Sequence, residues 1–277
     1  MQILEQTGPI GVFDSGYGGL TVLKDIVKVL PHHSFLYLGD NARAPYGSRS
    51  YETVYAYTLE CVKHLFDRGC HLVILACNTA SAKALRSIQQ TDLPRLAPAK
   101  RVLGVIRPTT EIVGNYSKSG TVGILGTSGT VNSLSYVVEI GKYFPHLKVV
   151  QHACPMWVPL IENQEYDNAG AEYFIQKDLD LLLKKGPNLD VVILACTHYP
   201  ILINKIRDYL PAHITILSQG PLVAEGLKNY LLRHQVIDQR CSKGGTVEFL
   251  TTDQPAVFDK GASIFYGSEV FSKQLQL

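Results

Sequence analysis

The sequence predicts an α/β protein with two doubly wound parallel-sheet domains, related by pseudo-two-fold symmetry, with the functional site in the cleft between them. Short apolar runs alternate with amphipathic helical segments, as is typical of a parallel sheet covered by helices. The stretch LVILACNTAS at residues 72–81 returns as VVILACTHYP at residues 191–200. At 277 residues the chain is long enough for two such units, each with its own core.

The first half of the chain contains three strand-and-helix pairs. The expected strands are Ile10–Phe13, Phe35–Leu38 and Leu72–Ala76, and the helices that follow them are Leu20–Leu30, Tyr51–Arg68 and Ser81–Gln89. In the second helix, apolar residues from Val54 to Phe66 recur at helical spacing, and Gly69 ends the segment.

The pattern restarts after the polar, proline-bearing stretch Thr91–Lys100. Strands are expected at Val102–Ile106, Val122–Leu125, Val149–His152 and Val191–Leu194, with a long helix at Ala169–Lys185. Ile214–Leu217, Val223–Leu232 and Val247–Leu250 continue the alternation and are expected to rejoin the first unit. We therefore expect one domain of residues 1–98 plus 213–277 and a second domain of residues 99–212.

The composition narrows the class of protein. The chain is 46% hydrophobic and 18% charged, with a net charge of +2, so neither disorder nor a nucleic-acid partner is expected. Its six cysteines form no CxxC pair, and we expect reduced thiols. The N-terminus MQILEQTGPIG does not read as a signal peptide, and no apolar run reaches the ~18–20 residues that span a bilayer. These features predict a cytoplasmic protein without a membrane partner.

Chemistry-bearing residues follow five of the expected strands. Parallel sheets bind ligands outside the carboxyl ends of their strands. The residues at these positions are Asp14, Asp40, Cys77, Thr127 and Cys196.

Two loops in the first half are candidates for ligand binding. FDSGYGG offers backbone N–H groups for an anion, together with Asp14 and Ser15. The alternative is a structural turn in which Asp14 caps the helix. In GDNARAPYG, Tyr46 and Gly47 are expected to line a ligand, although packing by Tyr46 and a simple turn would explain the same residues.

The repeated cysteine motifs carry the sharper signal. Cys77 and Cys196 each lie between a buried strand and the start of a helix, where the helix dipole is expected to lower the pKa of a thiol. A lone cysteine is more often a small buried hydrophobe, but two in equivalent turns need a further reason. The neighbouring polar residues that would bond to a ligand or thiol are Asn78, Thr79, Thr197 and His198.

Two further motifs complete the set. GTSGTVNS places the hydroxyls of Thr127 and Thr130 where a carboxylate would bind, or where Thr130 or Ser128 would cap the helix. CPMWVPLIE contains Glu162, which by itself would be read as a solvated acid. No HExxH motif or zinc-like spacing occurs, so no metal is expected.

Taken in order, DSGYGG, DNARAPYG, ACNTAS, GTSGT, CPMWVPLIE and ACTHYP closely resemble the glutamate racemases, from about Ile10 to the last helices. That family makes D-glutamate for bacterial peptidoglycan without a cofactor. The wider aspartate/glutamate racemase group shares the paired cysteines, but both end motifs look like the glutamate branch. The sequence departs from the family pattern at Ile106–Thr109, at Trp157 and at Gln219–Gly220, which leaves the cysteine motifs untouched.

The resemblance implies a two-base racemase with its active site in the cleft between the domains. Cys77 would deprotonate D-glutamate and Cys196 L-glutamate, while Asp14, His198 and Glu162 hold or relay protons. It also implies a homodimer with no cofactor. The expected substrate-binding residues are Asp14, Ser15, Tyr46, Gly47, Asn78, Thr79, Thr127, Thr130, Thr197 and His198.

Three alternatives stay open at this point. An aspartate or hydantoin racemase would keep the chemistry and change the substrate. A cysteine hydrolase would pair one cysteine with His198 and form an acyl-enzyme. A silent two-lobed binding protein would explain the architecture, but it would leave the repeated cysteine without a role.

Overall fold

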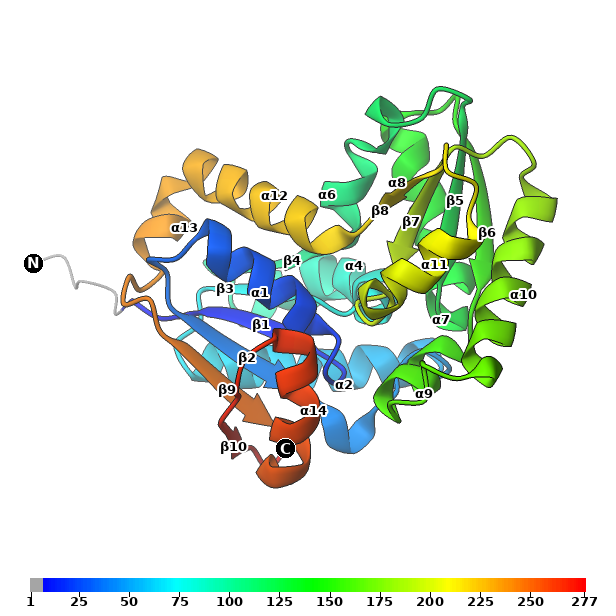
Figure 1. Cartoon of the computed structure of the whole chain (residues 1–277). Helices are drawn as coiled ribbons and strands as arrows, with labels where there is room; N and C mark the ends of the chain where they lie inside the picture. The colour runs from blue at the N-terminus through cyan, green and yellow to red at the C-terminus, as the bar shows by residue number, and fades with distance from the viewer. Residues whose placement is uncertain (1–6) are drawn as a thin grey trace, which may run out of the picture.

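The computed structural model describes residues 7–277, so the expectation about the N-terminal segment lies partly outside the described residues. Two sheets form the scaffold, with strand orders β10-β9-β2-β1-β3-β4 and β6-β5-β7-β8, and every strand pair is parallel (Figure 1). This architecture confirms the predicted fold class of two parallel-sheet α/β units.

The first sheet has buried central strands because helices cover both of its faces. Its strands are β1 (Ile10–Asp14), β2 (Phe35–Gly39), β3 (Leu72–Leu75), β4 (Arg101–Gly104), β9 (Val247–Thr251) and β10 (Ser272–Gln274). One core joins α1 (Gly19–Val29), α12 (Gln219–Arg233) and α14 (Pro255–Tyr266) to one face. The opposite core joins α2 (Tyr51–Asp67) and the helices that follow Cys77 to the other face. Burial on both sides explains why these strands read as continuous apolar runs.

The second sheet is smaller but covered in the same way. Its strands are β5 (Thr121–Gly126), β6 (Lys148–Ala153), β7 (Val191–Ala195) and β8 (Thr215–Leu217). On one face pack α6 (Ile106–Thr110) and α8 (Ser135–Tyr143), and on the other α9 (Trp157–Glu162), α10 (Ala169–Lys185) and α11 (Ile203–Tyr209).

The remaining elements are short. They are η1 (Asn41–Arg43), α3 (Asn78–Lys83), α4 (Leu85–Ser87), η2 (Ile88–Asp92), α5 (Leu93–Leu96), η3 (Val113–Asn115), α7 (Ser128–Asn132), η4 (Tyr199–Leu202) and α13 (Gln235–Gln239).

The two sheets repeat one strand order. The run β2-β1-β3-β4 in the first sheet has the same form as β6-β5-β7-β8 in the second. Strand β3, which precedes Cys77, therefore holds the same place in its sheet as β7, which precedes Cys196. The sequence repeat thus corresponds to a repeat of topology.

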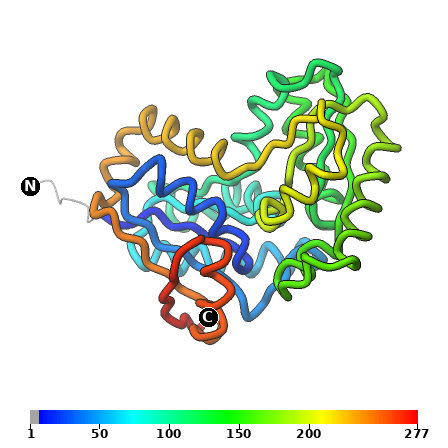
Figure 2. The backbone as a smooth tube through the Cα atoms, viewed as in Figure 1, coloured from blue at the N-terminus to red at the C-terminus, as the bar shows by residue number. Residues whose placement is uncertain are grey.

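Two of the expected strands are present, but each lies in a different sheet from the one predicted. The strand expected at Val102–Ile106 as the start of the second unit is β4, which pairs with β3 of the first sheet. The strand expected at Ile214–Leu217 in the first unit is β8, which pairs with β7 of the second. Alternation locates a strand but not its partner, so sheet membership was wrong for both. The chain passes from the first sheet to the second after β4 and returns to the first sheet after β8 (Figure 2). The division into domains by residue range stays a proposal.

The observed helix bounds agree best with the predicted ones where a capping residue and an apolar stripe both mark the helix. Helix α10 has the predicted bounds, and its first turn is capped by Asn168, whose Oδ1 accepts from the Ala171 N–H at 3.0 Å. Helix α2 ends at Asp67, and Gly69 follows with a φ of 89°. Helix α3 starts at Asn78, three residues before the expected start at Ser81, so Cys77 is itself the cap. This shift brings the first thiol onto the helix terminus.

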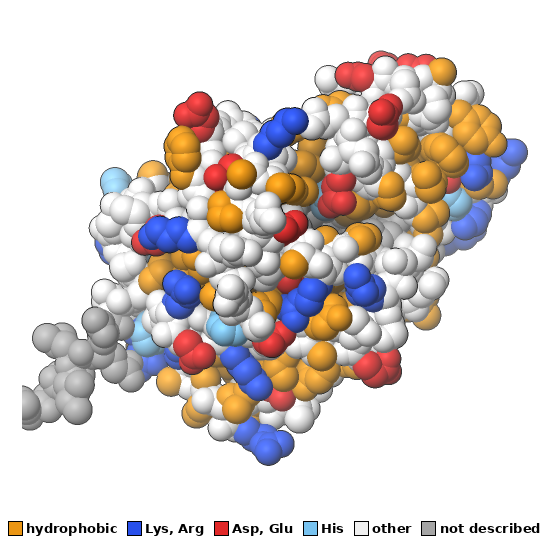
Figure 3. Space-filling view, turned by 90° about the horizontal axis from the view of Figure 1, so that it is seen from below, with side chains coloured by type: hydrophobic (Ala, Val, Ile, Leu, Met, Phe, Trp, Pro, Cys, Tyr) orange, Lys and Arg blue, Asp and Glu red, His pale blue; other side chains and the backbone are white. Residues whose placement is uncertain are grey.

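On the face seen in Figure 3, acidic and basic side chains are interspersed, so this surface has no large patch of positive or of negative charge. Within residues 7–277, none of the helices combines the length and apolar character that crossing a bilayer requires.

Candidate active site

Cys77 lies at the carboxyl end of β3 and caps α3. Its Sγ accepts from the Ala80 N–H at 3.4 Å and lies 3.5 Å from Ser15 Oγ. The residue is 6% exposed. Ser15 comes from the turn after β1, so two neighbouring strand ends of the first sheet supply this half of the site.

The environment of Cys77 favours the thiol. Burial and, to a smaller extent, the charge of Asp14 raise its pKa to about 12, although the bonds from Ser15 and Ala80 work in the opposite direction. The expectation of a lowered pKa is therefore wrong for this cysteine. The dipole of a six-residue helix is outweighed by the loss of water around the sulfur.

Cys196 follows β7 in the second sheet and has a different partner. Its Sγ lies 3.8 Å from His198 Nδ1, and His198 Nε2 lies 3.0 Å from Glu162 Oε1. Burial lowers the pKa of His198, but the hydrogen bonds to Cys196 and Glu162 outweigh it and raise the value to about 10. The ring is therefore an imidazolium at neutral pH, with one N–H directed to the sulfur and the other to the carboxylate. Glu162 is a bonded partner of His198 rather than a purely solvated acid.

Asp14 lies between these two turns. It is 1% exposed, and its Oδ1 accepts from the Gly16 N–H at 3.0 Å, whereas Oδ2 has no hydrogen-bond partner among residues 7–277. Burial raises the pKa of Asp14, His198 lowers it, and Glu162 raises it. An acid on the first sheet thus interacts with the charges around Cys196. No side chain caps α1 at Gly18, but the Gly19 N–H in the first turn of this helix also lowers the pKa of Asp14.

The two lobes touch closely around the thiols. Thr21 Oγ1 donates to the Thr197 carbonyl at 2.9 Å, and a Cβ atom on Gly18 would lie 2.2 Å from Thr197 Oγ1 and 2.5 Å from His198 Nδ1. Gly129 N–H donates to the Gly47 carbonyl at 2.8 Å on the other side of the site. Only glycine at position 18 permits this approach. Thr21 and Gly18 were not predicted as site residues, because their partners lie far away in sequence.

A chain of hydroxyls crosses the interface between the lobes. Thr79 Oγ1 lies 3.0 Å from Thr127 Oγ1, which in turn donates to Thr130 Oγ1 at 3.1 Å. Thr127 also caps α7 by accepting from the Thr130 N–H at 3.2 Å. The cap is therefore Thr127, not Thr130 or Ser128 as proposed from the sequence. Three of the predicted hydroxyl residues, Thr79, Thr127 and Thr130, are therefore brought together.

Asn78 is buried and bonded on both ends of its amide. Its Nδ2 donates to Gln219 Oε1 at 2.5 Å, and its Oδ1 accepts from Tyr136 OH at 2.7 Å. Sequence reasoning missed both partners. Gln219 stood out only as a departure from the family pattern, and Tyr136 was not singled out.

Tyr46 is 1% exposed and donates its hydroxyl to the Asp40 carboxylate. Asp40 also accepts from Arg43 Nε at 2.7 Å and from Thr252 Oγ1 at 2.9 Å. These bonds give the carboxylate of Asp40, which follows β2, hydrogen-bond partners from within the first lobe. Contact of Tyr46 with a ligand stays a prediction.

One group within residues 7–277 has the composition of a metal site. His152, Cys154 and Asp178 are buried, with ligand atoms within 4.8 Å of one another. His152 Nε2 lies 3.1 Å from Asp178 Oδ1, and Lys185 Nζ lies 3.3 Å from His152 Nδ1. The ammonium donates to Nδ1, so Nε2 carries the ring proton and donates to Asp178. This bonding takes up both ring nitrogens.

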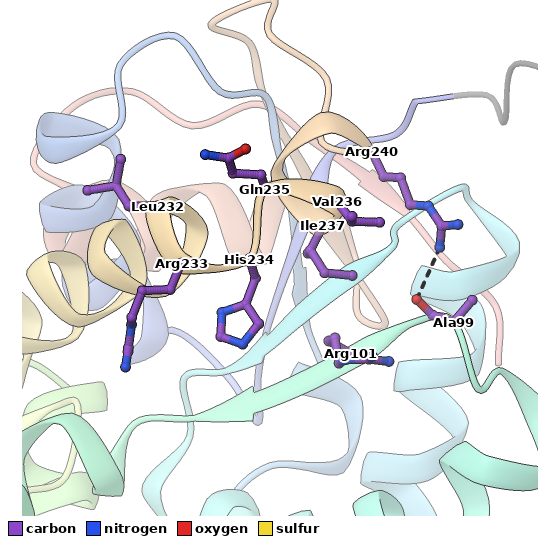
Figure 4. Close-up of a pocket in the computed structure, with 9 residues that line it drawn as sticks. All are labelled: Ala99, Arg101, Leu232, Arg233, His234, Gln235, Val236, Ile237 and Arg240. Carbon is purple, nitrogen blue, oxygen red and sulfur yellow. Dashed lines mark hydrogen bonds between the residues drawn. The ribbon is translucent and has the colours of Figure 1, made fainter.

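Two cavities lie elsewhere. One, of about 540 Å³, is lined by Arg101 at the amino end of β4, by the end of α12 and by α13, where Arg240 donates to the Ala99 carbonyl at 3.3 Å (Figure 4). The other, of about 1490 Å³, runs between α3, α4, α6, α8 and α12. Neither is lined by Cys77 or Cys196. Cys77 and Cys196 are each 6% exposed.

Comparison with known proteins decides the family. The profile of the Asp/Glu/Hydantoin racemase family matches residues 10–225, which is most of the chain. The chain belongs to the Asp/Glu/Hydantoin racemase family. Within this racemase family it is 37% identical to the glutamate racemase of Persephonella marina over 272 residues, covering 97% of each protein.

Solved racemase structures have the same fold. A glutamate racemase from Bacillus anthracis superposes with a TM-score of 0.88 at 33% identity, covering 98% of both chains. The glutamate racemase of Francisella tularensis, solved in complex with D-glutamate, superposes with a TM-score of 0.86 at 31% identity, covering 98% of this chain and 97% of the other. The resemblance inferred from six motifs is thereby confirmed over nearly the whole chain.

Proposed function

We propose that this protein interconverts L-glutamate and D-glutamate by moving the α-proton between Cys77 and Cys196, without a cofactor. One observation carries the proposal: the two thiols follow equivalent strands, β3 and β7, of two lobes that are in contact beside Cys196, where Thr21 Oγ1 donates to the Thr197 carbonyl at 2.9 Å. Membership of a racemase family and similarity to glutamate racemases support the reaction and the substrate.

Inversion of a carbon centre explains why two thiols are needed. A proton must leave one face of Cα and another must arrive on the opposite face. A thiolate on one side takes the α-proton, the electron pair stays on the carbon, and a thiol on the other side gives its proton to that pair. The two sulfurs end with exchanged protonation states, ready for the reverse substrate. As the family resemblance implies, Cys77 acts on D-glutamate and Cys196 on L-glutamate.

The neighbours of each sulfur supply the charge balance. The His198 imidazolium, held by Glu162 at 3.0 Å, faces Cys196 and compensates negative charge on that side. On the other side Ser15 and the Ala80 N–H donate to Cys77. The carbanion-like transition state needs donors that act more strongly on it than on bound substrate. We assign this task to Asn78, Thr79, Thr127, Thr130 and Thr197, with Ser15, Tyr46 and Gly47 as further anchors.

We extend the proposal to the biological role through the family resemblance. D-glutamate made by this protein supplies peptidoglycan synthesis in the bacterial cytoplasm, and the active form is a homodimer. Sedimentation of the purified protein tests the dimer independently of the activity.

Circular dichroism of L-glutamate over time tests the function directly, using purified protein with no cofactor added. The signal should decay to zero, and either Cys77→Ser or Cys196→Ser should abolish the decay. Cys70→Ala is a matched control, because this buried thiol lies outside the site. Decay with aspartate or a hydantoin but not glutamate would move the protein to another branch of the family. Retained decay in either serine variant would reject the two-thiol mechanism.

A further inference from the structure

A closed ring of hydrogen bonds lies beside the candidate site. Gln219 Nε2 donates to Tyr136 OH at 2.6 Å, Tyr136 OH donates to Asn78 Oδ1 at 2.7 Å, and Asn78 Nδ2 donates to Gln219 Oε1 at 2.5 Å. All three side chains are buried, with exposed fractions of 0–3%. Buried polar groups in such a ring hold one another in fixed orientations.

The direction of every bond in the ring follows from one backbone carbonyl. Gln219 Nε2 also lies 3.0 Å from the Val105 carbonyl, which can only accept, so this end of the amide must be the NH₂ group. Its second N–H donates to Tyr136, whose own O–H must therefore point to Asn78. Burial holds the pKa of Tyr136 well above its usual value, so the hydroxyl keeps that proton. Asn78 is left with its oxygen toward Tyr136 and its NH₂ group toward Gln219.

We infer that Gln219 and Tyr136 are positioning residues that fix the amide of Asn78, so that one N–H of Asn78 bonds to Gln219 and the other serves the substrate. The inference rests on the proposed function, in which Asn78 is a donor that stabilises the carbanion-like transition state. Among residues 7–277 the Nδ2 atom donates to Gln219 alone, which leaves its second hydrogen available.

The ring also joins elements of both lobes. Val105 directly follows β4, where the chain leaves the first sheet, and Gln219 begins α12, where it has returned from the second. Asn78 belongs to the first lobe and Tyr136, on α8, to the second. These elements meet at the junction of the lobes (Figure 1). The bond from Tyr136 to Asn78 therefore crosses from the second lobe to the first.

A double-mutant cycle of Tyr136→Phe and Asn78→Ala tests this inference. With Asn78 present, Tyr136→Phe should lower kcat/KM for glutamate roughly tenfold, as expected for a lost buried hydrogen bond. In the Asn78→Ala background it should have no further effect, because the residue through which it acts is gone. Equal losses in both backgrounds would overturn the inference, since a general structural defect would persist. Tyr55→Phe, which removes the bond from Tyr55 OH to Asp92, is the control and should leave kcat/KM unchanged.

Gln219→Glu supplies a second, nearly isosteric probe. A carboxylate still accepts from Asn78, but it cannot donate to Val105 or Tyr136. Tyr136 then turns its proton to position 219 and Asn78 Oδ1 loses its donor. We expect the loss of kcat/KM to match that of Tyr136→Phe and to vanish in the Asn78→Ala background. A loss that is unchanged without Asn78 would count against the positioning role.

Urea unfolding of the same four proteins of the first cycle separates failure of this inference from failure of the proposed function. If Tyr136 holds Asn78, the two substitutions are non-additive in unfolding free energy whatever the activity. Non-additive unfolding in a wild type that does not racemise glutamate would retain the contact and reject the proposed function. Additive unfolding would overturn the ring itself.

Discussion

The two cysteine turns occupy equivalent places in their sheets but differ in what surrounds them. Cys77 has a hydroxyl, a backbone N–H and a buried carboxylate nearby, and its pKa is raised to about 12. Cys196 has an imidazolium whose own pKa is raised to about 10, backed by Glu162. The repeat therefore sets where the two sulfurs lie, while unrelated neighbours set the charge on each side.

This difference fits a reaction in which the two sulfurs need opposite protonation states. The acid beside Cys77 disfavours negative charge there, whereas the residue beside Cys196 is the His198 imidazolium. If the two turns were identical, neither Cys77 nor Cys196 would be the preferred position of the one proton that the two sulfurs share. Substitutions on one side at a time test this difference.

Replacing either thiol should have the largest effect. Cys77→Ser and Cys196→Ser should each lower kcat/KM for glutamate by on the order of 10³-fold or more, because a hydroxyl is a far weaker acid than a thiol. Initial rates followed by circular dichroism in both directions measure this. A loss below about tenfold in either variant would show that the residue is not an acid or base in the reaction.

His198→Asn should have the next largest effect, roughly 10²-fold at neutral pH, because it removes the cation beside Cys196. Ser15→Ala, the corresponding change beside Cys77, removes only a 3.5 Å contact from a neutral donor and should cost a few-fold. Kinetics of both variants measure the contrast. Equal losses would mean that the two sides are electrostatically alike.

Asp14→Asn should stabilise the folded protein while lowering activity. Burial raises the pKa of Asp14, so this residue contributes stability below its ordinary value of 3.8 and loses it as pH rises through its folded value. At pH 7 the neutral amide avoids that cost, and we expect a gain of about 1 kcal/mol in unfolding free energy. Urea unfolding at pH 4 and pH 7 checks this, with the larger gain at pH 7. Alkylation of Cys77 should also become faster, since one cause of its raised pKa is removed.

The His198–Glu162 pair should give a smaller stability change at high pH. His198 has a pKa raised from 6.5 to about 10, so its contribution is complete below pH 6.5 and is lost as pH rises through about 10. Glu162→Gln removes the carboxylate from this pair and should cost about 1 kcal/mol at pH 7 but little at pH 10.5. Unfolding experiments at both pH values provide the comparison. A cost that does not change with pH would show that His198 is neutral throughout.

The features of the fold and the site that depend on neighbouring residues in the sequence could be predicted. The repeat of VILAC located both sulfurs, and the apolar stripe with its flanking residues predicted α10 at Ala169–Lys185. The positions of Asp14 and Thr127 followed from the rule that parallel sheets bind at their carboxyl edge, and His198 was expected as a neighbour of Cys196.

Features that depend on distant partners could not be predicted. Strands β4 and β8 were placed in the wrong sheets because periodicity does not specify pairing. The pKa of Cys77 depends on burial, which the motif does not show. Asn78 bonds to Gln219 across 141 positions and to Tyr136 across 58, and no spacing in the chain indicates either contact.

The most direct measurement is exchange of the α-hydrogen in deuterium oxide, followed by NMR for each enantiomer with each serine variant. A single remaining thiol can still remove and return a hydrogen on its own face. Cys77→Ser should therefore exchange the α-hydrogen of L-glutamate only, and Cys196→Ser that of D-glutamate only, neither with racemisation. Exchange of the same enantiomer in both variants, or of both enantiomers in one, would contradict a two-thiol site with one sulfur on each face.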